Sequence, residues 1–85
     1  MTFAVFYDKQ PSKFLKKMDK HTAKRIITKL DALFEKGAVP HDAKSLVGEH
    51  GVYRIRIGDY RAIYRINYDT KKIIVFKIEK RAKAY

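Results

Sequence analysis

The fold is decided by the stretch Val52-Tyr-Arg-Ile-Arg-Ile-Gly-Asp-Tyr-Arg-Ala-Ile-Tyr64. Apolar and aromatic side chains alternate with arginines on both sides of Gly58-Asp59, which is typical of two half-buried strands. Glycine at the first position of a two-residue turn suits a type II′ hairpin. We therefore predict strands over Val52 to Ile57 and Tyr60 to Tyr68, joined by this turn.

A two-residue turn also fixes which residues lie opposite one another. The core face of the hairpin then holds the pairs Ile57 and Tyr60, Ile55 and Ala62, and Tyr53 and Tyr64. The other face holds Arg54, Arg56, Arg61 and Arg65. Arg56 opposite Arg61 is destabilising unless an anion binds there, and the planar guanidinium suits a phosphate.

A third strand over Ile73 to Ile78 is predicted to return after a turn at Asp69 to Lys71. A turn of three or five residues would bring Glu79 opposite Arg61, and that ion pair is the alternative explanation for Arg61 alone. Arg81 shares its strand parity with Val75, Lys77 and Glu79. We therefore expect Arg81 to reach the arginine-bearing face from the end of the strand.

Two amphipathic helices are predicted before the hairpin. Pro11 suits the first turn of the first helix, and its apolar face is formed by Phe14, Leu15 and Met18. The second begins near Thr22 and stops at Gly37, with an apolar face formed by Ala23, Ile26, Ile27, Leu30, Leu33 and Phe34. We interpret the lysines on its outer face as a solvated surface.

The segments on either side of the helices complete the fold. Thr2 to Tyr7 is short, aromatic and β-branched, which predicts a strand buried on both faces inside the sheet. Ala38 to Gly51 contains Pro40 and Gly48 and is interpreted as a loop. The order β-α-α-β-β-β predicts one α+β domain over residues 1–85, with both helices on one face of a mainly antiparallel sheet.

Composition limits the partners. The chain has 85 residues, a formal net charge of +11 and no cysteine. This charge favours polyanions, nucleic acid foremost, and the absence of cysteine favours a reducing cytoplasm. We expect no signal peptide or membrane span. His21, His41 and His50 lack the spacing of a metal site, so we predict surface histidines, no metal and no cofactor.

The chain resembles RelE-type toxins of the RelE/ParE superfamily. The resemblance is carried by Tyr53-Arg-Ile-Arg-Ile-Gly-Asp-Tyr-Arg-Ala-Ile-Tyr64, preceded by Lys44-Ser-Leu-Val-Gly48 and followed by Lys80-Arg81 and Tyr85. It implies the RelE-like fold and the toxin of a type II toxin–antitoxin system. The implied activity is a metal-independent endoribonuclease that cuts mRNA in the ribosomal A site. A RelB-like antitoxin would silence it.

The resemblance also implies roles for individual residues. Arg61, Arg81 and Tyr85 match the catalytic positions, and RNA binding falls to Arg54, Arg56, Arg65, Lys44, Lys80 and Lys83. Arginine is not deprotonated in proteins, so it can hold phosphate but cannot act as a base. We predict that Tyr85 is the general base, its phenol pKa lowered by nearby cations, with Lys80 or Lys83 as alternatives.

Two other functions stay open from the sequence. A ParE-like toxin would share the fold but act on DNA gyrase through protein contacts, without needing the arginines or Tyr85. A plain RNA-binding module would usually display aromatic side chains among its basic residues. Tyr53, Tyr60 and Tyr64 are predicted on the core face instead, which argues against such a module.

Overall fold

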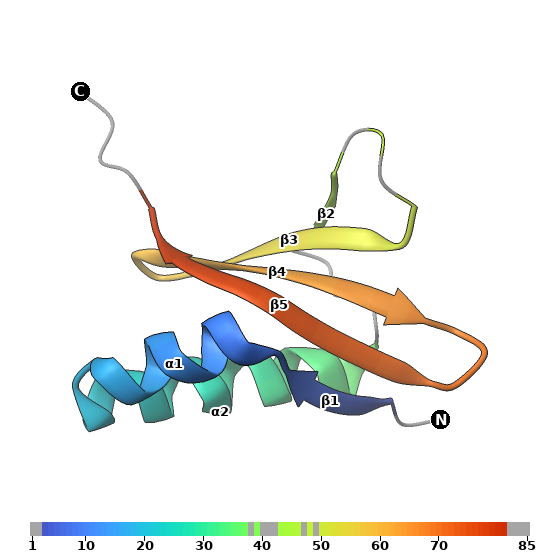
Figure 1. Cartoon of the computed structure of the whole chain (residues 1–85). Coiled ribbons are helices and arrows are strands. Elements are labelled where there is room, and N and C mark those ends of the chain that lie inside the picture. The colour runs from blue at the N-terminus through green and yellow to red at the C-terminus, as the bar shows by residue number, and fades with distance from the viewer. Residues whose placement is uncertain (1–2, 38, 40–42, 47, 49, 82–85) are drawn as a thin grey trace.

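The computed structural model describes residues 3–37, 39, 43–46, 48 and 50–81. In chain order the elements are β1 (Ala4–Tyr7), α1 (Lys9–Lys17), α2 (Lys20–Lys36), β2 (Lys44–Ser45), β3 (Val52–Ile57), β4 (Tyr60–Asn67) and β5 (Lys72–Lys80). The strands form one sheet in the order β1-β5-β4-β3-β2, and both helices lie on one side of it (Figure 1). The predicted α+β architecture is confirmed, with β2 as an additional strand inside the expected loop.

The β3–β4 hairpin has the predicted register. Ile57 pairs with Tyr60, and Arg56 pairs with Arg61. Gly58 has a φ of 59°, whereas the φ of Asp59 is not positive, as a type II′ turn requires. A side chain at position 58 would be strained at this φ, which explains why glycine stands there.

The predicted pairing of Arg61 with Glu79 is confirmed, but the loop length and the strand geometry that produce it differ from the prediction. The connecting loop spans residues 68–71, an even number, because Asn67 pairs with Lys72. A β-bulge between the pairs of Ile63 and Tyr64 then shifts the register by one residue. The shift restores the predicted pairing of Arg61 with Glu79.

The bulge changes which side chains share a face. Phe76 is the extra residue on β5, because Val75 pairs with Tyr64 and Lys77 with Ile63. Val75 is fully buried in the core, while Lys77 is exposed on the opposite face. The predicted common parity of Val75 with Glu79 is therefore wrong, because a strand without a bulge was assumed.

β1 lies at the edge of the sheet, which corrects the prediction of a strand buried on both faces. It pairs only with β5, in parallel, from Ala4 to Tyr7. Phe6 is 48% exposed, and the ammonium group of Lys72 lies 5.5 Å from the centre of its ring. The aromatic side chain is thus covered on one side by a lysine instead of a second layer.

The core lies between the helices and the sheet. α2 contributes Ile26, Leu30 and Phe34, and the ring of Phe34 meets that of Tyr64 edge-on at 4.8 Å. Desolvation by burial, with smaller contributions from neighbouring tyrosines, raises the pKa of Tyr64 well above its ordinary value. None of the described helices is both long and apolar enough to span a bilayer.

Both helices begin at an aspartate that caps them. The carboxylate of Asp8 accepts a hydrogen bond from the backbone N–H of Lys9, and that of Asp19 accepts one from Thr22. The backbone and hydroxyl hydrogen bonds from Thr22 lower the pKa of Asp19. These caps fix where α1 leaves β1 and where α2 turns back across the sheet.

α1 also completes the edge of β5. β1 covers only Lys72 to Val75 of that edge. Beyond it, the side-chain amide of Gln10 donates to the carbonyl of Ile78 at 3.0 Å and accepts from its N–H at 2.9 Å. A primary amide thus replaces the missing strand partner of Ile78.

Candidate nucleic-acid interface

The sheet face opposite the helices carries the predicted cations. We call it the arginine face. Strand pairing and parity place on it the charged residues Lys44, Arg54, Arg56, Arg61, Arg65, Lys72, Lys77, Glu79 and Arg81. No helix covers this face in the described part of the chain (Figure 1).

Cross-strand pairs arrange these side chains in rows. One row runs from Lys44 of β2 through Arg54 of β3 to Ile63 of β4 and Lys77 of β5. The next row holds Arg56, Arg61 and Glu79. Rows on one face are about 7 Å apart along the strands. The predicted cluster of Arg54, Arg56 and Arg61 is therefore present, and β2 adds Lys44 to it.

Glu79 is the only acid on the arginine face among the described residues. Its carboxylate lies 2.7 Å from Arg61 Nε and 3.3 Å from Lys77 Nζ. The Arg61 contact meets the distance of an ion pair, but Nε makes no well-aligned hydrogen bond. Arg61 is thus held by charge while its Nε donor remains poorly used, and the alternative prediction of this ion pair is confirmed.

Arg81 is anchored on the hairpin turn. Its backbone N–H donates to the carbonyl of Asp59 at 2.7 Å, and its guanidinium Nη1 donates to the carbonyl of Gly58 at 3.3 Å. The turn therefore fixes Arg81 near the row of Arg56 and Arg61, as its parity with Glu79 predicts.

Apolar side chains lie among the cations. Val52 is buried and pairs with Arg65, which in turn pairs with Ile74. The Arg65 guanidinium lies 5.7 Å from the centre of the Phe76 ring. Lys77 shares the parity of Glu79, as predicted. Sequence reasoning missed Phe76, since its direction depends on the bulge.

The remaining predicted residues lie elsewhere. Lys80 pairs with Tyr60, so its parity is that of the core face and not of the arginine face. Lys83 and Tyr85 lie outside the described residues. His21 and His50 are exposed, as predicted, whereas His41 also lies outside the described residues.

Tyr53, Tyr60 and Tyr64 turn to the core, as predicted. The arginine face can therefore bind phosphate through several guanidinium groups, with Phe6 and Phe76 as its aromatic side chains in the described part of the chain. Apart from Glu79 and the lysines Lys44, Lys72 and Lys77, its described ionisable groups are arginines, which are already protonated and cannot act as a base. Phosphate binding is thus well provided for, whereas the arginines supply no general base.

Comparisons with known proteins agree with this geometry. Residues 5–85 match the family described as the ParE toxin of type II toxin–antitoxin systems, parDE. A curated relative from Methanocaldococcus jannaschii, which bears the name toxin RelE1, is 34% identical over 88 residues. The match covers 100% of this chain and 97% of the relative.

Solved structures show the same fold. The RelE–RelB complex from Pyrococcus horikoshii contains a chain with 35% identity and a TM-score of 0.81, with 99% of this chain and 100% of that chain covered. The isolated Escherichia coli RelE toxin reaches the same TM-score of 0.81 at 19% identity, covering 98% of this chain and 88% of its own. The second likeness concerns the fold alone.

Proposed function

The chain belongs to the ParE toxin family of type II toxin–antitoxin systems, as a RelE-type toxin, and from this premise we propose that it is a ribosome-dependent endoribonuclease. It cleaves mRNA in the ribosomal A site in the cytoplasm and thereby stops translation. The observation that carries the proposal is the opposed pair Arg56 and Arg61 on an uncovered face. Among the described residues Glu79 pairs with Arg61 but not with Arg56, so the opposed arginines still gain from a bound phosphate.

The proposed reaction needs no metal. A ribose 2′-oxygen attacks the adjacent 3′ phosphorus, the bond from phosphorus to the 5′ oxygen breaks, and a cyclic phosphate and a 5′-hydroxyl result. Arg61 stabilises charge on the phosphate and Arg81 the leaving oxygen. Tyr85, in its ionised form, takes the proton of the 2′-hydroxyl, and a proton from water completes the 5′-hydroxyl. The RNA is held by Lys44, Arg54, Arg56, Arg65, Lys80 and Lys83.

The proposed inhibitor is a RelB-like antitoxin. The Pyrococcus horikoshii relative was crystallised with RelB, and a net charge of +11 on this chain favours an acidic partner. Much of such an antitoxin would become ordered on binding. Expression of the chain alone should arrest growth, and co-expression with its antitoxin should restore it.

One comparison tests the proposal. The purified chain is added to a reconstituted translation reaction, and new RNA ends are mapped with and without ribosomes. We expect cuts within codons at the A site, only with ribosomes present. Intact mRNA in a reaction that contains the folded chain would overturn the proposal.

The family description favours one second candidate. It names ParE, and a ParE-like toxin would act on DNA gyrase through protein contacts. The same preparation is therefore added to a DNA supercoiling reaction with gyrase. Inhibited supercoiling together with intact mRNA would favour this second function.

A further inference from the structure

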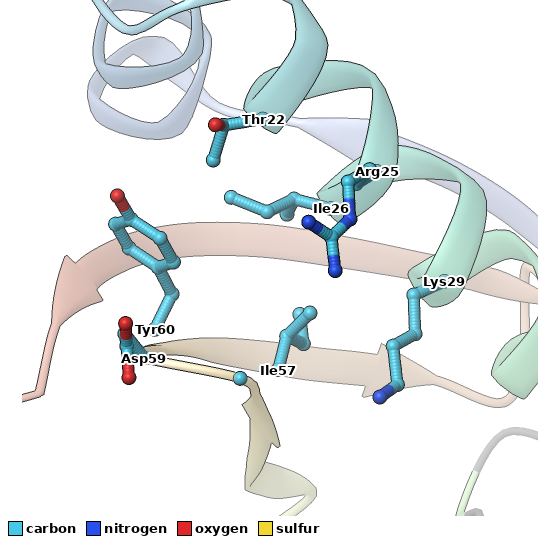
Figure 2. Close-up of a pocket in the computed structure, with 8 residues that line it drawn as sticks. Thr22, Arg25, Ile26, Lys29, Ile57, Asp59 and Tyr60 are labelled. Atoms are coloured by element: carbon cyan, nitrogen blue, oxygen red, sulfur yellow. The ribbon is translucent and has the colours of Figure 1, made fainter.

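A second cationic site lies on the helix-bearing side of the sheet. It is a pocket of about 350 Å³ between α2 and the end of the β3–β4 hairpin. α2 lines it with Thr22, Arg25, Ile26 and Lys29, and the hairpin with Ile57 and Tyr60 (Figure 2). The proposed RNA cleavage uses none of these side chains.

The pocket offers positive donors without a paired acid. Figure 2 shows Arg25 and Lys29 extending from the same side of α2 toward the hairpin, with the Tyr60 hydroxyl directed toward the helix layer. Within the described residues, neither cation has a carboxylate at ion-pair distance. Asp59 at the rim offsets one of the two positive charges, so the lining of the pocket keeps a net charge of +1. An anion would therefore gain contacts that the chain itself does not satisfy.

The base of the pocket is apolar. Ile26 is 2% exposed and Ile57 is 5% exposed, so they form a closed floor beneath the cations. The one aromatic ring in the lining, that of Tyr60, already packs edge-on against Phe14 at 6.0 Å. A stacked RNA base would need a free aromatic face, whereas a carboxylate on an apolar stem matches both the floor and the rim.

We propose that this pocket binds an acidic segment of a partner protein. A glutamate or aspartate side chain lies between Arg25 and Lys29, and an apolar neighbour of the segment covers Ile26 and Ile57. The wall of the pocket includes Gly58 and Asp59, whose carbonyls hold Arg81 on the other side. A segment bound in the pocket can thus pass the turn to reach the arginine face. The proposal holds whether or not the chain cleaves RNA.

The test uses the full chain and a synthetic peptide of alternating glutamate and leucine, titrated by NMR. The double variant Arg25→Gln/Lys29→Gln should bind the peptide about 10-fold more weakly or worse, as expected for lost charge-assisted hydrogen bonds. Tyr60→Phe should weaken binding by a smaller factor, about threefold. The matched control Lys20→Gln/Lys36→Gln removes two exposed cations of the same helix outside the pocket.

Three outcomes would overturn the proposal. Equal weakening in both double variants would mean that the peptide senses only the overall charge. Equal affinity for a peptide with glutamine in place of glutamate would show that the carboxylate does not contribute to binding. Loss of affinity for a single-stranded RNA, specific to Arg25→Gln/Lys29→Gln and without an effect on the peptide, would make the pocket an RNA contact.

Discussion

Glu79 occupies a place on the arginine face where a phosphate would otherwise meet Arg61. Its carboxylate lies 2.7 Å from Arg61 Nε and 3.3 Å from Lys77 Nζ. Both side chains of the Arg61 pair are 31% exposed, so water screens the contact and its net strength is modest. An incoming phosphate must nevertheless displace Glu79 or bind beside it.

The substitution Glu79→Gln should therefore raise affinity for a short single-stranded RNA about 3- to 10-fold, because Arg61 and Lys77 become free for phosphate. Fluorescence anisotropy at fixed salt measures the change. The control Asp69→Asn removes the same charge from the loop 68–71, away from the arginine face. An equal gain in RNA affinity in both variants would mean that affinity depends on the net charge alone.

Arg61→Ala should lower ribosome-bound cleavage by about 100-fold or more, as for the loss of one donor to a transition-state anion. Thermal unfolding should still be cooperative, because Arg61 is a partly exposed side chain. Single-turnover cleavage on programmed ribosomes is the measurement. Unchanged cleavage would leave Arg61 as a structural partner of Glu79.

Tyr85→Phe removes a hydroxyl and keeps the ring. If Tyr85 is the base, the cleavage step should slow by about 100-fold or more while ribosome binding stays unchanged. The wild-type rate should rise with pH from neutrality as the phenol ionises, and the variant should lose this dependence. A variant with full rate and the same pH profile would transfer the role to Lys80, Lys83 or a ribosomal group.

For individual residues, the sequence predicts more than half of the side chains on the arginine face. Strand alternation and a two-residue turn suffice to place Arg54, Arg56 and Arg61 together. They do not suffice for Phe76, because this extra residue in β5 reverses the direction of the side chains before it. The bulge has no signature in the local sequence.

Among the elements, β5 depends on a side chain for part of its edge. Gln10 of α1 forms two hydrogen bonds with the backbone of Ile78, at 3.0 and 2.9 Å. Ile78 is fully buried and lies directly before Glu79. The contact therefore ties the start of α1 to the strand that carries Lys77, Glu79 and Arg81.

Gln10→Met keeps the length of the side chain and removes both hydrogen-bonding groups. It should lower the free energy of unfolding by about 1 to 2 kcal/mol, because the N–H and C=O of Ile78 lose their partners. Urea unfolding provides the value. Lys13→Met is the control, at an exposed position on the same helix, and should change the free energy of unfolding by less than about 0.5 kcal/mol. Equal losses of stability in both variants would mean that the methionine acts through helix propensity and not through the hydrogen bonds.

The elements that sequence reasoning placed well carry strong local signals. α2 has apolar residues at helical spacing between Asp19 and Gly37, and the hairpin has its glycine turn. β2 was missed because its two residues are positioned only by pairing with β3. The edge position of β1 was also missed, since aromatic residues such as Phe6 do not reveal whether a second layer covers them.

The molecule as a whole presents cations on two sides of a thin body. Its shortest extent is 22 Å, which exceeds the Debye length of about 8 Å at physiological salt. The exposed basic residues of α2, such as Lys24 and Lys36, are therefore screened from a ligand on the opposite sheet face. An RNA that binds by overall charge would use both sides, whereas one that binds as proposed would use the arginine face and not the outer face of α2.

Salt dependence separates these two modes. For single-stranded RNA, log K falls against log salt with a slope of about −0.7 per neutralised phosphate. If Arg54 and Arg56 each neutralise one phosphate, Arg54→Gln/Arg56→Gln should reduce the size of this slope by about 1.4. Lys24→Gln/Lys36→Gln removes the same charge from α2 and should leave the slope unchanged.

The comparison is made by anisotropy titrations at several salt concentrations with one RNA. Equal slopes for the two double variants would show that the RNA responds to the net charge of +11 and not to a particular face. A reduced slope confined to Arg54→Gln/Arg56→Gln would localise the phosphates on the sheet. That result requires the strand register that places Arg54 and Arg56 on the side away from the helices.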